Sequence, residues 1–338
     1  MEEKTKKIIK LIFIITGVSI IVLITIFQSM NLDLNTDYKA GVTFSRPYAE
    51  ELGVEPDLAL QAALDDLGVR HFRVPAYWNM IQPSKYYWDF GWLDQDLDAI
   101  AERGGKVTLA IGHKLPRWPE CWTPTWARSY SQDELETAVK LYLKEVVTRY
   151  KDHPAVEAYQ VENEPNFPFG ICPEIREDFI DEEIAYVREL DHSKPIATTD
   201  SGELTLWGLG GKVERLGVSV YRVVKSPIGI FRYWFVPPQL YLRKGQVAKF
   251  FYGTDQIYIS EFQMEPWVDT TIPEASLEEQ FQTFDLRQMQ KNIAYAKKMG
   301  LPRIDFWGVE WWYYMKEVHN KPEFWEESKN IFNNQDQD

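Results

Sequence analysis

Strand-like runs alternate with helix-like runs along most of this chain. The strand-like runs are short and mostly apolar, and each is followed by a longer segment with helical spacing. Eight such runs can be placed, at 39–44, 71–75, 106–112, 156–164, 195–199, 216–221, 256–261 and 303–307. This alternation indicates parallel strands joined by helices. The sequence therefore predicts an α/β fold, a (β/α)8 TIM barrel with its functional groups at the carboxyl ends of the strands.

The helix-like runs carry signals that mark where they begin and end. Capping boxes at Ser131 and Ser276 open helices that we expect to end at Tyr150 and Met299. The other expected helices are 56–67, 93–103, 173–190 and 322–332. No longer-period repeat is visible, and the length of 338 residues suits one barrel, with two small domains as the alternative.

The first 37 residues differ in composition from the rest. Apolar residues fill most of Ile8–Phe27, which is about the 20 residues that a helix needs to cross a bilayer. Lysines precede this run and acidic residues follow it, so the positive-inside rule places the N-terminus in the cytoplasm. We expect a single-pass cell-membrane anchor within 1–37, an extracytoplasmic barrel over 38–332 and a polar tail over 333–338. A cleaved signal peptide is the alternative.

Charge and special residue types narrow the possible partners. The net charge of -14 and the pI near 5.0 argue against a nucleic-acid partner. The 13 tryptophans exceed what a core alone asks for, and such rings suit the apolar faces of sugars. Cys121 and Cys172 could form one disulfide in an exported domain, or could be free core residues. Both states of the cysteines stay open, as does the oligomeric state.

One segment reverses the acidic character of the chain. Arg215–Thr254 contains no Asp or Glu, but it holds seven Lys and Arg side chains among several aromatic residues. Such a segment could touch the anionic surface of a membrane, where basic residues are attracted to lipid. The alternative is a solvated helix that covers the barrel.

Two glutamates fall at predicted strand ends that face each other across a barrel mouth. Glu164 follows Asn163 and precedes Pro165, which cannot continue a strand, and Glu261 closes the seventh strand. Retaining glycosidases use two carboxyl groups about 5 Å apart, one as acid/base and one as nucleophile. We assign Glu164 as acid/base, with its pKa raised by burial, and Glu261 as nucleophile, kept ionised by a cation for which Arg73 is the candidate.

Neighbouring acids have weaker claims to the same roles. Glu162 should point inward, as a buried partner of Arg73 or Lys106 rather than a catalytic group. Glu265 and Glu310 are less well placed substitutes for Glu261. The histidines are scattered without metal-ligand spacing, and no phosphate-binding or nucleophile-elbow motif occurs, so we expect no metal and no cofactor.

These residues resemble the clan A glycoside hydrolases, especially families 5 and 39. The residues that carry the resemblance are Asn163-Glu164-Pro165, Glu261, Arg73, His113, Tyr221 and Trp307. It implies the same roles for the two glutamates. It also implies that Asn163 binds the sugar 2-hydroxyl and that Arg73 and Tyr221 hold the nucleophile. Trp307 would form the base of the subsite at the cleaved bond, and His113 would be a supporting group.

Two features separate the chain from a single family of the clan. Gln160-Val-Glu-Asn-Glu164 is also similar to family 35 β-galactosidases, and Ser219 stands where family 5 usually has a histidine. The expected activity is hydrolysis of a β-glycoside by double displacement, with an oligo- or polysaccharide outside the cytoplasm as substrate. A transglycosylase of the same fold and a non-catalytic carbohydrate-binding barrel are the alternatives. Six tryptophans fall in predicted rim loops, as sugar platforms or as loop packing: Trp78, Trp118, Trp122, Trp267, Trp311 and Trp312.

Overall fold

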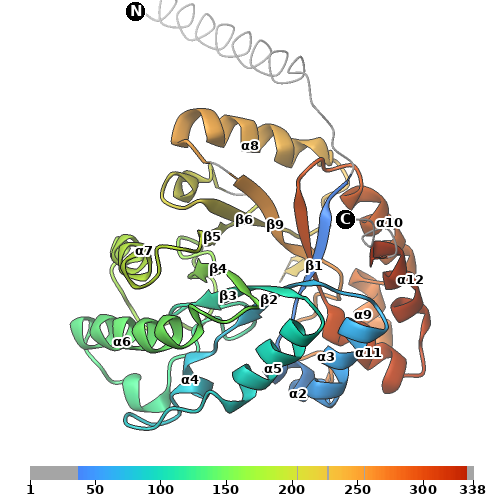
Figure 1. The fold of residues 1–338 in the computed structure, drawn as a ribbon. Helices are drawn as coiled ribbons and strands as arrows, with labels where there is room; N and C mark the ends of the chain where they lie inside the picture. The colour runs from blue at the N-terminus through green and yellow to red at the C-terminus, as the bar shows by residue number, and fades with distance from the viewer. Residues whose placement is uncertain (1–36, 204, 227, 255, 333–338) are drawn as a thin grey trace, which may run out of the picture.

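The computed structural model describes residues 37–332 except 204, 227 and 255. Eight parallel strands close into a barrel in the order β1-β10-β9-β6-β5-β4-β3-β2, which confirms the expected (β/α)8 fold (Figure 1). The barrel strands are β1 Lys39–Thr43, β2 His71–Pro75, β3 Lys106–Ile111, β4 Val156–Val161, β5 Ile196–Asp200, β6 Arg215–Val220, β9 Gln256–Gln263 and β10 Arg303–Trp307.

Helices surround the barrel on its outside. They are α2 Arg46–Glu51, α3 Pro56–Asp65, α4 Trp78–Ile81, α5 Gly91–Glu102, α6 Gln132–Tyr150, α7 Phe179–Leu190, α8 Gln239–Tyr252, α9 Leu277–Thr283, α10 Leu286–Ala296, α11 Val309–Glu317 and α12 Glu323–Phe332. Their buried faces and the outward faces of the strands share one apolar core, in which Leu60, Val107, Leu143 and Ile304 are at most 2% exposed. Burial of this surface is the main force that holds the helices on the barrel.

At three places after β6 the structure differs from the sequence prediction. The helix expected from Ser276 to Met299 is two helices, because Phe284 is extended and the Asp285 side chain accepts the backbone N–H of Gln288 as a new N-cap. A hairpin of β7 Val223–Ser226 and β8 Gly229–Arg232 follows β6. α11, expected as a loop, directly follows β10.

The predicted membrane span Ile8–Phe27 and the predicted polar tail lie outside the described residues. Within the described part of the chain, no helix is both long and apolar enough to cross a bilayer. The segment without acidic residues contains α8, which lies on the outside of the barrel at the top of Figure 1.

Candidate active site

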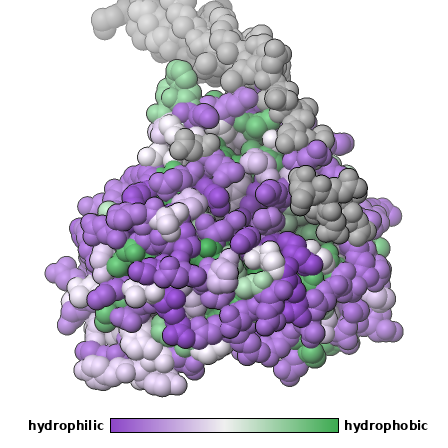
Figure 2. All heavy atoms as spheres, in the orientation of Figure 1, coloured by the Kyte–Doolittle hydropathy of each residue, from purple (hydrophilic) through white to green (hydrophobic). Residues whose placement is uncertain are grey.

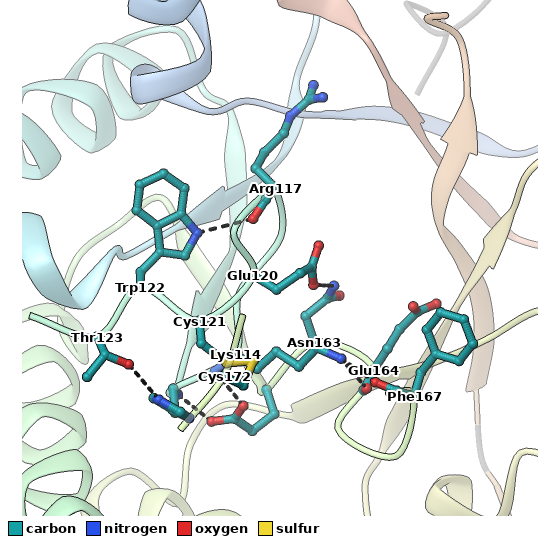
Figure 3. The surroundings of a disulfide bond; sticks show 12 residues. Lys114, Arg117, Glu120, Cys121, Trp122, Thr123, Asn163, Glu164, Phe167 and Cys172 are labelled. Atoms are coloured by element: carbon teal, nitrogen blue, oxygen red, sulfur yellow. Dashed lines mark hydrogen bonds between the residues drawn. A yellow bond between two sulfur atoms is a disulfide. The ribbon is translucent and has the colours of Figure 1, made fainter. Parts of the chain in front are cut away.

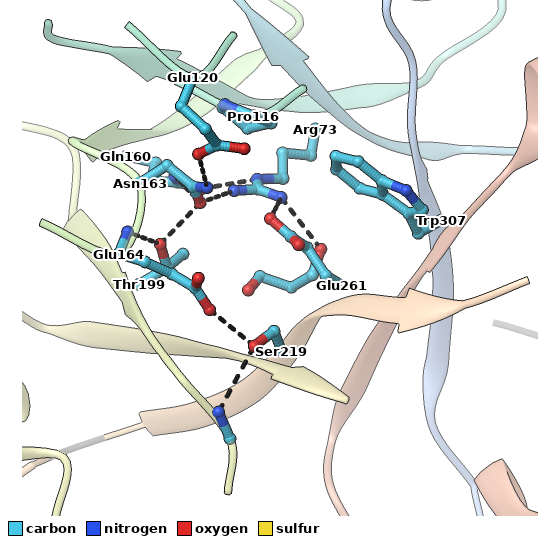
Figure 4. Close-up of polar contacts among 12 residues, drawn as sticks. Arg73, Pro116, Glu120, Gln160, Asn163, Glu164, Thr199, Ser219, Glu261 and Trp307 are labelled. Carbon is cyan, nitrogen blue, oxygen red and sulfur yellow. Dashed lines mark hydrogen bonds and ion pairs between the residues drawn. The ribbon is translucent and has the colours of Figure 1, made fainter. Parts of the chain in front are cut away.

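The carboxyl ends of four strands bring polar side chains into one cluster. β2 contributes Arg73, the end of β4 contributes Asn163 and Glu164, and β9 contributes Glu261. Ser219 comes from β6, beside β9 in the barrel. Figure 4 shows the carboxyl groups of Glu164 and Glu261 turned toward the same space. The barrel thus brings together residues that are far apart in sequence.

Arg73 is the centre of this cluster and is fully buried. Its guanidinium donates to Glu261 Oε1 at 2.8 Å, to Gln160 Oε1 at 2.7 Å and to Asn163 Oδ1 at 2.5 Å. The other carboxylate oxygen of Glu261 accepts the hydroxyl of Tyr221 at 2.8 Å. Both oxygens of Glu261 therefore act as acceptors, with a fixed orientation and a buried cation beside them.

Glu164 has a different environment. Its Oε1 accepts the hydroxyl of Ser219 at 2.6 Å, and its backbone N–H donates to Thr199 Oγ1 at 2.8 Å. Burial and, after it, the nearby negative charge of Glu261 raise the pKa of Glu164 to about 7. The two carboxyl groups of the site therefore differ in environment. Glu164 can hold a proton near neutral pH, whereas Glu261 forms an ion pair with Arg73.

The backbone after β4 bends earlier than the sequence predicts. β4 ends at Val161 rather than Glu164, because Glu162 and Glu164 adopt left-handed backbone conformations with φ of 59° and 46°. Glu162 accepts the backbone N–H groups of His113 and Lys114, the second at 2.7 Å. The expected pairing of Glu162 with Arg73 or Lys106 was wrong, since alternation predicts where an extended side chain points and this turn is not extended.

A third carboxyl group, Glu120, lies in the same cluster and was missed from the sequence. It is 8% exposed, and its Oε2 accepts the amide of Asn163 at 3.3 Å. Burial and then the charge of Glu261 raise the pKa of Glu120 to about 8. Glu120 lies in a loop after β3, where no periodic pattern marks it. The one sequence signal close to it is the next residue, Cys121, a candidate for a disulfide.

Cys121 and Cys172 form a disulfide. It joins the loop after β3, which contains Glu120, to the loop after β4, which contains Glu164 (Figure 3). Lys114 ties the same two loops together, since its ammonium donates to the carbonyl oxygens of Glu164 and Phe167 at 3.0 and 2.6 Å. The disulfide and the hydrogen bonds of Lys114 therefore hold the two loops that contain Glu120 and Glu164 together.

A cavity of about 640 Å³ opens beside the cluster. Tyr221, Glu120 and Trp307 belong to its wall, and Glu261 contacts this wall through the hydroxyl of Tyr221. Neighbouring aromatic rings continue along the wall, with 5.2 Å between the ring centres of Tyr221 and Trp267 and 5.7 Å between those of Trp118 and Phe169. Trp118 also belongs to this aromatic wall, and its ring is exposed.

Trp307 and its neighbours form a rigid part of the wall. The guanidinium of Arg117 lies between the rings of Trp307 and Tyr48, at 3.9 and 3.6 Å from their centres. Arg117 also forms ion pairs with Glu265 and Glu310, and Trp307 donates its indole N–H to Glu265 at 2.7 Å. The two acids considered as substitutes for Glu261 are therefore both engaged by one arginine.

The remaining expected site residues fall into two groups. His113 lies outside the cavity wall, where its Nε2 shares a hydrogen bond of 2.7 Å with Thr123 and burial lowers its pKa to about 4. Trp78, Trp311 and Trp312 are fully buried and pack loops and helices. Trp118, Trp122 and Trp267 line the cavity. Among the described residues, no three His, Cys, Asp or Glu side chains are grouped to hold a metal ion.

Comparisons with known proteins find glycoside hydrolases. A family described as β-galactosidase matches residues 61–127, which include Arg73 and Glu120. A β-1,4-xylanase of Dictyoglomus thermophilum is 26% identical over 282 residues, 73% of each chain. A probable mannan endo-1,4-β-mannosidase C of Aspergillus terreus is 38% identical over 116 residues, but the match covers only 29% of each chain.

Solved structures share the fold. Xylanase 10B of Thermotoga maritima has a TM-score of 0.56 at 16% identity, over 80% of this chain and 83% of that one. A β-galactosidase of Halorubrum lacusprofundi has a TM-score of 0.51 at 14% identity, and the match spans 79% of this chain but about half, 52%, of that one. The barrel, the match to the β-galactosidase family and the similarity to the β-1,4-xylanase together place the chain among the clan A glycoside hydrolases, as a glycosidase.

Proposed function

We propose that this glycosidase cleaves β-glycosidic bonds with retention of configuration, by double displacement. The observation that carries the proposal is the contrast between the two carboxyl groups. Glu261 is held by Arg73 and Tyr221, while Glu164 has a pKa raised to about 7. The predicted separation of about 5 Å between the two carboxyl groups is part of this proposal.

The reaction follows from these two roles. A carboxylate oxygen of Glu261 attacks the anomeric carbon while the bond to the leaving oxygen breaks, and Glu164 gives its proton to that oxygen. The product of this step is a glycosyl ester on Glu261. Glu164, now ionised, takes a proton from water as the water oxygen attacks the anomeric carbon. The ester bond then breaks, which releases the sugar and restores both glutamates.

A trapping experiment tests the nucleophile. An activated 2-deoxy-2-fluoro β-glycoside slows both steps, and its good leaving group lets the glycosyl ester accumulate. Mass spectrometry of a protease digest, with fragmentation of the labelled peptide, is expected to find the sugar on Glu261 itself. A sugar attached to Glu265 or Glu310 would overturn the assignment.

We propose a β-linked oligo- or polysaccharide as substrate, processed outside the cytoplasm by a membrane-tethered enzyme. The names of the relatives refer to xylan, mannan and galactosides, and the aromatic wall supplies flat surfaces for successive sugars. The Cys121–Cys172 disulfide supports an oxidising compartment. A panel of aryl β-glycosides, assayed with the purified full chain, would identify the sugar. No turnover of any β-glycoside would contradict the proposal.

The hydrogen bond from Ser219 to Glu164 predicts a change in pH dependence. This bond stabilises the ionised carboxylate, so Ser219→Ala should raise the pKa of Glu164 and preserve its acid form to higher pH. We expect the alkaline limb of the kcat/KM profile to move up by about 0.7 pH unit, the equivalent of about 1 kcal/mol. Ser226→Ala, on the exposed hairpin, is the matched control. An unchanged or lowered limb would refute the link.

The contact between Glu120 and Asn163 predicts a graded loss of activity. Glu120→Ala removes the acceptor of the Asn163 amide, and we expect kcat/KM to fall about 10- to 100-fold, or about 1–3 kcal/mol. Glu120→Gln keeps an acceptor oxygen and should lose less. Steady-state kinetics at pH 6 checks the order of the two variants. Equal losses of kcat/KM in Glu120→Ala and Glu120→Gln would show that the hydrogen-bond acceptor for the Asn163 amide does not determine activity.

A further inference from the structure

Large hydrophobic side chains are exposed in one part of the surface, on α8 and the segment before it. Of the 18 large hydrophobic side chains exposed on the described residues, nine lie between 228 and 252. They are Ile228, Ile230, Phe231, Trp234, Phe235, Val247, Phe250, Phe251 and Tyr252. Single exposed hydrophobic residues are ordinary, but a concentration of this kind marks a surface that contacts something.

Four of the strongly exposed side chains are aromatic and form two pairs of sequence neighbours. Phe250 and Phe251, at the end of α8, are 82% and 69% exposed, with 5.1 Å between their ring centres. Trp234 and Phe235, before α8, are 82% and 64% exposed, with 5.9 Å between ring centres. We call these four residues and Tyr252 the α8 surface. Figure 2 shows hydrophobic atoms over α8 at the upper edge of the molecule. Aromatic rings of this kind partition well into the headgroup region of a bilayer.

The charge around the α8 surface suits an anionic partner in a chain that is otherwise strongly acidic. No Asp or Glu occurs between Arg215 and Thr254, although the chain carries a net charge of -14. Several cations of this segment have partners in the protein, among them Lys225 with Asp269 and Lys244 with the carbonyl of Gly202. The main electrostatic feature of the α8 surface is therefore that its own segment, 215–254, contains no carboxylate. Carboxylates at this surface would repel anionic lipid.

The place where the barrel joins the preceding chain points to the same partner. Ten residues, 28–37, separate the apolar run that ends at Phe27 from Tyr38. Fully extended, they reach at most about 35 Å. β1 begins at Lys39, and Figure 1 shows the start of β1 on the same side of the barrel as α8. A bilayer that holds Ile8–Phe27 would thus lie within reach of the α8 surface.

We propose that the α8 surface docks on the lipid headgroups of the membrane in which the N-terminal segment is anchored. This inference rests on the anchor proposed above and adds a second contact that fixes how the barrel stands on the bilayer. The aromatic side chains enter the interface roughly 5–10 Å deep, as the apolar faces of interfacial helices do. Lys249, beside Phe250 in α8, adds attraction to anionic lipid.

The test uses the full chain reconstituted in vesicles of phosphatidylcholine and phosphatidylglycerol. Because both native cysteines are in the disulfide, a single introduced cysteine can be labelled with a polarity-sensitive fluorophore. The test positions are Phe250→Cys and Trp234→Cys. The control is Leu141→Cys, because Leu141 is 47% exposed and belongs to α6, a helix away from α8 in Figure 1. Flotation of the vesicles reports the anchor, and quenching by a lipid nitroxide reports contact with lipid.

We expect the protein to float with the vesicles. The fluorescence emission of the labels at 250 and 234 should shift to the blue and be quenched at least about twofold, because only side chains in the interface approach the nitroxide. The label at 141 should be unaffected. Floated protein with equal, water-like emission at all three positions would overturn docking and leave the anchor intact. A blue shift without quenching would place a second copy of the chain on the α8 surface, and would also overturn the proposal. Protein that does not float would overturn the anchor and docking together.

Discussion

Glu261→Ala is expected to abolish turnover of β-glycosides, with kcat reduced by at least about 10⁴-fold, which corresponds to more than about 5 kcal/mol of transition-state stabilisation. The carboxylate of Glu261 is the only proposed group that can form the covalent bond to the sugar. Added azide should restore activity in this variant, because a small anion can occupy the space left by the carboxylate and attack the anomeric carbon. The recovered product should be an α-glycosyl azide, which liquid chromatography with mass spectrometry and NMR would identify.

The rescue also separates a chemical defect from a folding defect. Loss of Glu261 leaves Arg73 without its ion-pair partner in a fully buried position, so some loss of stability is expected. Thermal unfolding of Glu261→Ala and of Glu261→Gln measures this cost, and Glu278→Ala, at an exposed position of α9, serves as the control. Wild-type turnover in the Ala variant would show that the nucleophile assignment is wrong.

Glu164→Ala should lose activity in a manner that depends on the leaving group. Natural glycosides need a proton on the departing oxygen, and we expect their kcat/KM to fall about 10²- to 10⁴-fold, the usual contribution of general acid catalysis. Aryl glycosides with acidic phenol leaving groups need little protonation in the first step, so they should retain far more activity.

The wild-type pH profile provides a second measure of the same role. Since the pKa of Glu164 is raised to about 7, the acid form should disappear as the pH passes that value, and kcat/KM should fall on the alkaline side. In Glu164→Ala this alkaline limb should vanish for aryl substrates. Equal losses on both substrate classes, or an unchanged limb, would count against Glu164 as the acid.

The barrel could be predicted because its strands carry their pattern locally. Short apolar runs bounded by Gly, Pro and polar residues located all eight barrel strands. Barrel topology alone then brought Glu164, Glu261 and Arg73 toward one end, since strands four and seven face each other across the mouth. The contacts of Arg73 with Glu261 and of Tyr221 with Glu261 follow from that geometry.

The rest of the cluster depends on loops and long-range contacts, which periodicity does not encode. Glu120 reaches Asn163 because a loop without regular structure is joined by the Cys121–Cys172 disulfide to the loop after β4. Glu162 left its expected position because the chain turns through a left-handed conformation there. Ser219 was noticed only as a departure from a family pattern, but it donates directly to Glu164.

The stereochemistry of the first released sugar tests the central claim most directly. Proton NMR recorded during the first minutes of hydrolysis of an aryl β-glycoside resolves the two anomers before mutarotation mixes them. Double displacement through Glu261 inverts the anomeric carbon twice, so the account predicts that the β-anomer appears first. Initial release of the α-anomer would mean a single displacement by water, and would contradict the role of Glu261 as nucleophile.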